Sequence, residues 1–140
     1  MAGEYFVAAQ LNARGIPSSI TYGNAKKADI VAYSGDKNFC EVIEVKTTSQ
    51  NKWVVGNKTP EKSRDLWCLV YLSESFEPEF FILTSNDLNE ILTPYDIAYR
   101  ERYRNKHGKE FEGKGVVSIK RTDVQHFQNS WETISARFNV

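Results

Sequence analysis

The sequence predicts an α/β fold in which a sheet of several strands is flanked by helices. Three observations lead to this fold class. A helical pattern opens the chain at residues 2–14, short apolar runs typical of strands fill residues 18–84, and helical patterns return from residue 85 onward. The 140 residues are near the commonest domain size and contain no linker, repeat or low-complexity tract. We therefore expect a single domain that covers residues 1–140.

The first half of the chain is predicted to form one helix followed by three strands. Val7 and Leu11 lie four residues apart in the helix, and Gly15 supplies its C-terminal stop. The segment 34–38 is polar, contains a glycine and has the length of a hairpin turn, so the strands on either side of it should pair antiparallel. The three strands are expected at residues 18–22, 29–33 and 39–46.

The second half is predicted to add two buried strands and several helices. The near-continuous apolar runs at 67–72 and 79–84 are typical of strands that are buried on both faces. Short strands are expected at 52–55 and 116–119, a short helix at 60–65, and longer helices at 85–92, 96–106 and 122–138. Large apolar side chains assigned to the core are Trp67, Phe80, Phe81 and, as one stripe of the last helix, Phe127, Trp131 and Ile134. Trp53 lies beside lysines and could stack on a base, but the core is its more frequent place.

Two acids and a lysine around the predicted hairpin carry the chemistry. Side chains alternate along a strand, so Glu44 and Lys46 should project from one face while Ile43 and Val45 face an apolar layer. The hairpin should bring Asp29 close to Glu44. Mg²⁺ is usually held by one or two carboxylates, which Asp29 and Glu44 would supply, and Lys46 could orient or deprotonate a water or stabilise a phosphorane. The structural alternative is two solvated acids and a surface lysine.

These segments resemble the PD-(D/E)xK nuclease superfamily. Ala28-Asp29-Ile30 fits the position of the first catalytic acid, and Glu44-Val45-Lys46 fits the acid-x-lysine motif. The segment 3–11 fits the opening helix, in which many members carry a glutamate near the metal, here Glu4. The runs at 67–72 and 79–84 fit two later strands of the core sheet. Ala28 stands where the family has the proline of its name, and no feature identifies a subfamily.

The resemblance implies a restriction-endonuclease-like core, with a central mixed sheet of four to five strands flanked by helices. It also implies phosphodiester hydrolysis with Mg²⁺, for which Mn²⁺ can substitute, most often as a DNA endonuclease. Asp29, Glu44, Lys46 and Glu4 would be the catalytic residues, and Asp29 and Glu44 the metal ligands. Some proteins of such folds only bind a partner. A catalytically inactive module that binds nucleic acid or protein is therefore the alternative.

DNA is the expected partner, although eighteen basic and eighteen acidic residues give a net charge of zero. Phosphate contacts are expected from basic and hydroxyl side chains that cluster around the proposed site in the sequence, and from a basic stretch at 99–109 for which a solvated, salt-bridged helix is the equal alternative. The polar segment 47–51 is predicted to be a loop. The candidates for nucleic-acid binding are Lys26, Lys27, Thr47, Thr48, Lys52, Arg100 and Arg104. A homodimer would suit an enzyme that cuts both strands.

The remaining composition excludes several other classes of protein. No apolar run approaches the roughly 20 residues that span a bilayer, and the N-terminus lacks the pattern of a secretion signal, so we expect no membrane association and a cytoplasmic location. The resemblance to the PD-(D/E)xK superfamily implies a prokaryote or phage as the source. Cys40 and Cys68 lie in predicted strands without zinc-site spacing and are expected to be apolar fillers. The HEXXH, Gly-x-Ser-x-Gly, GxxxxGK[ST] and GxGxxG motifs are absent.

Overall fold

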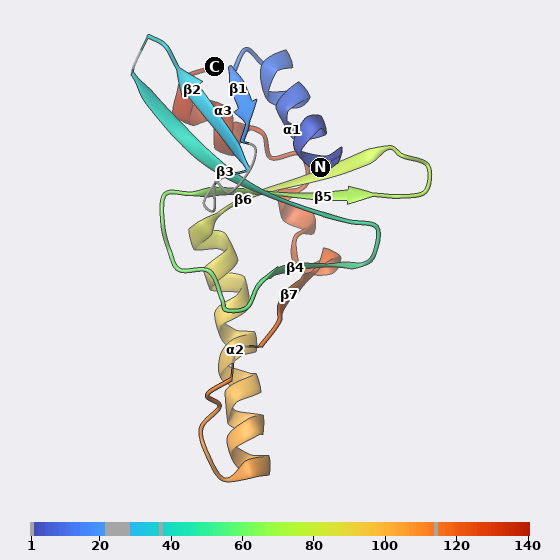
Figure 1. Ribbon diagram of the computed structural model, residues 1–140, viewed down its shortest axis with the longest axis vertical. Coiled ribbons are helices and arrows are strands. Elements are labelled where there is room, and N and C mark those ends of the chain that lie inside the picture. The colour runs from blue at the N-terminus through green and yellow to red at the C-terminus, as the bar shows by residue number, and fades with distance from the viewer. Residues whose placement is uncertain (1, 22–28, 37, 114) are drawn as a thin grey trace.

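A computed structural model of the chain describes residues 2–21, 29–36, 38–113 and 115–140. Its central feature is a five-stranded sheet in the order β1-β2-β3-β5-β6 (Figure 1). The strands are β1 (Ser18–Ile20), β2 (Ile30–Ser34), β3 (Phe39–Thr48), β5 (Leu66–Leu72) and β6 (Pro78–Thr84). β3 and β5 pair parallel and all other neighbours pair antiparallel, so the sheet is mixed. The predicted α/β fold with a mixed sheet flanked by helices is confirmed.

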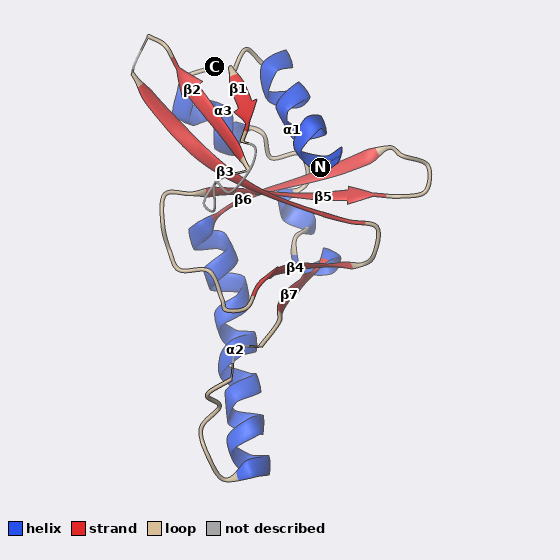
Figure 2. Cartoon of the chain, in the orientation of Figure 1, coloured by secondary structure: helices blue, strands red, loops and turns tan. Residues whose placement is uncertain are grey.

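One face of the sheet is covered by α1 (Ala2–Ala13) and α3 (Glu132–Phe138) (Figure 2). α1 buries Val7 and Leu11 against this face, as their spacing predicts, and ends before Gly15, whose φ of 79° lies in the left-handed region. α3 adds Trp131, which precedes its first residue, and Ile134 to the same apolar cluster. These side chains meet the inward-facing residues of β3, β5 and β6.

The opposite face is covered by the long helix α2 (Ser85–His107) and by a separate two-stranded ribbon, β4 (Lys52–Gly56) paired with β7 (Val117–Lys120). The ribbon buries Trp53, Val55 and Ile119, and α2 buries Leu88 and Leu92 in the same cluster. Trp53 is 1% exposed and donates its indole N–H to the Val70 carbonyl at 2.9 Å, so it belongs to the core as predicted.

The helix α2 replaces the two helices predicted at 85–92 and 96–106. A capping box at Thr84 and Asp87 starts it, and it continues through the exposed Pro94 to His107. Beyond Leu92 its side chains are exposed or half-buried, and this half extends past the rest of the protein (Figure 1). The prediction of a helix break was wrong because Pro94 removes only one hydrogen bond on the solvent side.

Two further helix predictions were wrong. Residues 60–65 form bends: the Ser63 hydroxyl accepts from the Asp65 N–H at 3.2 Å, and this local bond replaces a helical one. In the predicted helix 122–138 only α3 is α-helical. It is preceded by the 3-10 turns η1 (Arg121–Asp123) and η2 (Gln125–Phe127) and by Asn129, whose φ is 56°. Phe127 consequently packs in the α2 cluster and leaves the predicted stripe with Trp131.

Smaller differences concern the end of β3 and the cysteines. Thr47 and Thr48 extend β3, so the predicted loop begins two residues later than expected. Both cysteines are free, with Cys68 buried as expected, but Cys40 is exposed and fills no gap in the core. No helix among the described residues is long and apolar enough to cross a membrane.

Candidate active site

Strand β3 presents Glu44 and Lys46 on the sheet face that also carries Trp67 and Leu69. Burial alternates along β3, so Ile43 and Val45 are buried on the α1 side while Glu44 and Lys46 are half-buried on the other. Glu44 lies opposite Trp67 and Lys46 opposite Leu69 in the parallel pairing with β5. The predicted placement of acid and lysine on one face is confirmed.

Asp29 meets this pair at the point where the pairing of β2 with β3 ends. Ile30, the first residue of β2, lies opposite Ile43, so Asp29 stands one step further along, beside Glu44. Its Oδ2 atom accepts a hydrogen bond from the Val45 N–H at 2.9 Å. The side chain thus continues the hydrogen-bonding ladder and fixes its carboxylate beside the acid-x-lysine segment.

The two carboxyl groups act on each other. The pKa of Glu44 is raised from 4.5 to about 7, first by burial, then by the charge of Asp29 and by a side-chain hydrogen bond with Asp29. Lys46 opposes this increase and Asp65 adds to it. Two acids in contact cannot both ionise cheaply without a compensating cation. Burial and the charge of Asp29 therefore favour the protonated form of Glu44 at pH values where an ordinary glutamate is ionised.

Asp65 belongs to this group of charges and was missed by the sequence-based prediction. It stands directly before β5, the strand next to β3, and its carbonyl accepts hydrogen bonds from the Ser85 N–H at 3.1 Å and hydroxyl at 2.7 Å. The prediction of a helix at 60–65 concealed it. The available signal was an acid directly before an apolar strand, the same signal that identified Asp29.

Glu4 lies in the first turn of α1, which approaches the end of β3 very closely. A Cβ atom on Gly3 would lie 1.9 Å from the Thr47 hydroxyl oxygen, so only glycine permits this packing. Thr47 directly follows Lys46, and the Oε2 atom of Glu4 is buried. The structure therefore brings Glu4 to the α1 side of the same strand end, and its catalytic role stays a prediction.

The pair Asp29 and Glu44 fits a hard divalent cation. Among the described residues no three His, Cys, Asp or Glu side chains group together to hold a metal. Mg²⁺ needs only one or two carboxylates, because water and substrate oxygens complete its coordination. Burial is the first cause of the raised pKa of Glu44, and the charge of Asp29 is the second; a cation between the two carboxylates would neutralise that charge.

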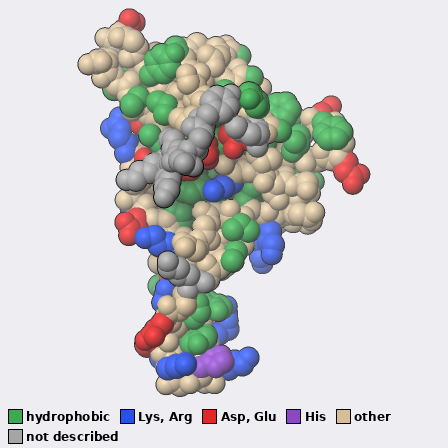
Figure 3. Space-filling view, in the orientation of Figure 1, with side chains coloured by type: hydrophobic (Ala, Val, Ile, Leu, Met, Phe, Trp, Pro, Cys, Tyr) green, Lys and Arg blue, Asp and Glu red, His purple; other side chains and the backbone are tan. Residues whose placement is uncertain are grey.

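The structure places the residues predicted to contact nucleic acid in different parts of the protein. Thr47 and Thr48 follow Lys46 in β3, and Lys52 is exposed at the start of β4. Figure 3 shows basic and acidic side chains gathered near the centre of one face of the protein, above the ribbon. Lys26 and Lys27 lie outside the described residues.

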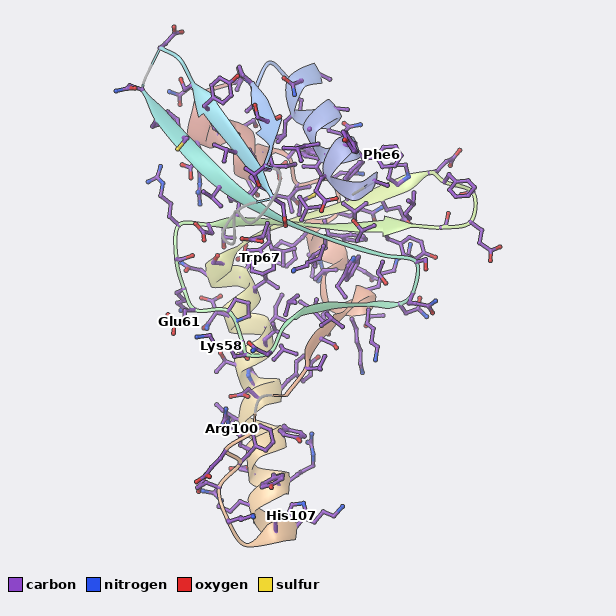
Figure 4. The ribbon with its side chains drawn as sticks, viewed as in Figure 1. Phe6, Lys58, Glu61, Trp67, Arg100 and His107 are labelled. Atoms are coloured by element: carbon purple, nitrogen blue, oxygen red, sulfur yellow. The ribbon has the colours of Figure 1, made fainter. Side chains whose placement is uncertain are left out.

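Arg100 and Arg104 are not brought to the carboxylates. Both lie in the projecting half of α2, and Figure 4 shows Arg100 well below Trp67, the neighbour of Glu44. The Arg100 guanidinium pairs with Asp96 at 3.0 Å, and that of Arg104 pairs with Glu110 at 3.3 Å. These local ion pairs favour the alternative of a salt-bridged, solvated helix.

Comparisons with known proteins support the fold. No protein-family model matches the chain, and none of the curated proteins is significantly similar to it. Among solved structures, the chain is similar to a bacterial homing endonuclease, I-Ssp6803I, with a TM-score of 0.56 and 12% sequence identity over 99% of this chain and 91% of that one. The chain has a nuclease-like fold. At this identity the likeness shows the fold alone, so the chemistry must be argued from the site.

Proposed function

We propose that this protein is a divalent-metal-dependent endonuclease of the PD-(D/E)xK type that hydrolyses phosphodiester bonds in DNA. One observation carries the proposal: the Asp29 carboxylate is hydrogen-bonded to β3 beside Glu44, whose pKa is raised to about 7, with Lys46 on the same strand face. Clustered acids with a strongly shifted pKa are typical of sites that bind a cation or move protons.

In this proposal Asp29 and Glu44 hold the metal, Mg²⁺ or Mn²⁺. When bound, the metal supplies a Lewis acid for the phosphate and an acidified water. Among the described residues, Lys46 is the cation that lowers the pKa of Glu44, and its place beside this carboxylate would let it orient a water or stabilise charge on the phosphate. Glu4, at the first turn of α1, is proposed as the assisting acid.

DNA is proposed as the substrate because the chain has the fold of a bacterial homing endonuclease and because Thr47 and Thr48 continue the strand past Lys46. Their hydroxyl groups and the backbone N–H groups of the following loop are groups that contact phosphates and sugars. A homodimer would supply one site for each strand of a duplex.

The deciding experiment compares the wild type with Lys46→Ala in the nicking and linearisation of plasmid DNA, with Mg²⁺, Mn²⁺ or EDTA. We expect metal-dependent cleavage that falls by about 10²–10³-fold in the variant, the usual cost of losing one preorganised donor. Lys58→Ala is the matched control, because Lys58 is an exposed lysine in the loop after β4. Binding of plasmid without metal-dependent cleavage by the wild type would establish the alternative, an inactive nuclease-fold module.

A further inference from the structure

A hollow in the surface lies at one end of the β4–β7 ribbon. It has a volume of about 780 Å³ and is formed by the loop between β3 and β4, the ends of the two ribbon strands, and the turns η1 and η2. Its wall includes Gln50, Asn51, Lys52, Lys120, Thr122 and Gln125, all exposed. Asp29, Glu44 and Lys46 do not line it, so it is separate from the candidate active site.

Two lysines face each other across this ribbon. Lys52 and Lys120 are direct partners in the antiparallel pairing, next to the buried pair Trp53 and Ile119, so both lysines share the outward face. Neither forms an ion pair with any acid that the structure describes. Like charges directly opposite each other destabilise a strand pair. Burial of Trp53 and Ile119 holds the two cations together, and an anion between them would relieve the repulsion.

The other side chains around the hollow are suited to reading bases. The amides of Gln50, Asn51 and Gln125 each combine a donor and an acceptor, the pattern that recognises the adenine edge in the major groove. The Arg121 N–H donates to the Asn51 carbonyl at 2.8 Å and ties this loop to the end of β7. The guanidinium of Arg121 forms an ion pair with Glu79. Among the described residues that line the hollow, Lys52 and Lys120 are therefore the cations without an ion-pair partner.

The ribbon and the candidate active site lie on the same side of the sheet. Trp53 and Ile119 pack in one cluster with Trp67 and Leu69, the β5 residues opposite Glu44 and Lys46. The chain also runs directly from Lys46 through the end of β3 into Gln50 and β4. A two-stranded antiparallel ribbon fits the major groove of B-DNA. A DNA duplex that places a phosphate at Lys46 would therefore also lie against the ribbon.

We propose that the end of the β4–β7 ribbon is the DNA-reading surface of this protein. Lys52 and Lys120 each neutralise a phosphate, and the amides of Gln50, Asn51 and Gln125 reach base edges in the major groove. The inference rests on the proposed function for the identity of the ligand, but it concerns binding and specificity, which can be measured without cleavage.

The test measures binding of a fluorescein-labelled 30-base-pair duplex of mixed sequence, with Ca²⁺ in place of Mg²⁺ and a gel check that the duplex stays intact. Lys52→Ala/Lys120→Ala should weaken binding at least tenfold and reduce the slope of log K against log salt by about 2, because each lost phosphate contact changes it by about 0.9. Lys52→Arg/Lys120→Arg should restore both. The thermal midpoint of the alanine variant should not fall, since a repulsion has been removed.

A second measurement tests the amides. Selection from a randomised duplex library should give a different preferred sequence for Gln125→Ala than for the wild type, with an unchanged salt slope, because base contacts carry specificity and phosphate contacts carry the salt dependence.

The matched control is Lys58→Ala/Lys62→Ala, which removes two exposed lysines outside this hollow; Figure 4 shows Lys58 beside Glu61, with which it pairs at 3.9 Å. Equal affinity and slope for the ribbon variant and this control would overturn the ribbon proposal. If the wild type still cleaves plasmid with Mg²⁺ in that case, the proposed function survives. If the ribbon variants change affinity, salt slope and preferred sequence as expected, but the wild type shows no metal-dependent cleavage, only the proposed nuclease activity is overturned.

Discussion

Glu41 and Glu44 lie three residues apart on β3, yet the charges that surround them are of opposite sign. Glu41 is 1% exposed and is held by two arginines: Arg64 contacts both of its carboxylate oxygens, and Arg137 lies 2.9 Å from Oε2. Glu44 is half-buried and faces another acid, Asp29. Burial alone therefore does not identify a functional acid. The sign of the neighbouring charges separates a structural carboxylate from a candidate metal ligand.

The largest expected effect is on activity at Glu44. Glu44→Gln removes a proposed metal ligand, so plasmid cleavage should fall by about 10²–10³-fold or more, and the rise in thermal midpoint caused by Mn²⁺ should disappear. In metal-free buffer at pH 8 the variant should be at least as stable as the wild type, because it removes one of two repelling charges. Wild-type cleavage by Glu44→Gln would show that the two acids do not differ in function.

The next effect is on stability at Glu41. Glu41→Gln keeps the shape of the side chain but leaves Arg64 and Arg137 without their anion, so the free energy of unfolding should fall by about 2 kcal/mol. Chemical denaturation measures this change. Cleavage per folded molecule should stay within a few-fold of the wild type. A loss of activity as large as that of Glu44→Gln, at unchanged stability, would contradict the assignment of Glu41 as structural.

A third effect is on the pH dependence of stability. The pKa of Glu44 is about 7 in the folded protein and near 4.5 in the unfolded chain, so the folded state binds more protons between these values. Stability from this group is fully present below pH 4.5 and is lost as the pH rises to about 7. Metal-free wild type should therefore lose stability in this window relative to Glu44→Gln. Parallel curves for the two proteins would show that Glu44 ionises normally.

Asp29→Asn sharpens the same measurement. Removing the Asp29 charge takes away the second-largest cause of the raised pKa of Glu44. The pH range over which the protein loses stability should therefore become narrower, with its upper limit moving toward 4.5. Burial of Glu44, the largest cause, remains in this variant. An unchanged window would therefore mean that desolvation alone sets the pKa, and that the two carboxylates do not interact.

Patterns of near neighbours in the chain were sufficient to predict most of the fold. The period of two in β3, the antiparallel pairing of the strands on either side of 34–38 and the spacing of Val7 and Leu11 each depend on a few consecutive residues, and each is confirmed. The same patterns placed Glu44 and Lys46 on one face and brought Asp29 to them. Local rules determine these features because backbone geometry alone fixes which way successive side chains point.

Contacts between distant segments decided the rest. The short α3 follows Asn129, whose N–H donates to the Phe80 carbonyl of β6 at 2.8 Å. The Asp65 carbonyl is likewise fixed from a distant segment, by the N–H and the hydroxyl of Ser85. The opposite charge environments of Glu41 and Glu44, and the facing of Lys52 and Lys120, are likewise tertiary facts. Electrostatic interactions depend on distance in space and on burial, and the order of the residues in the chain predicts neither of them.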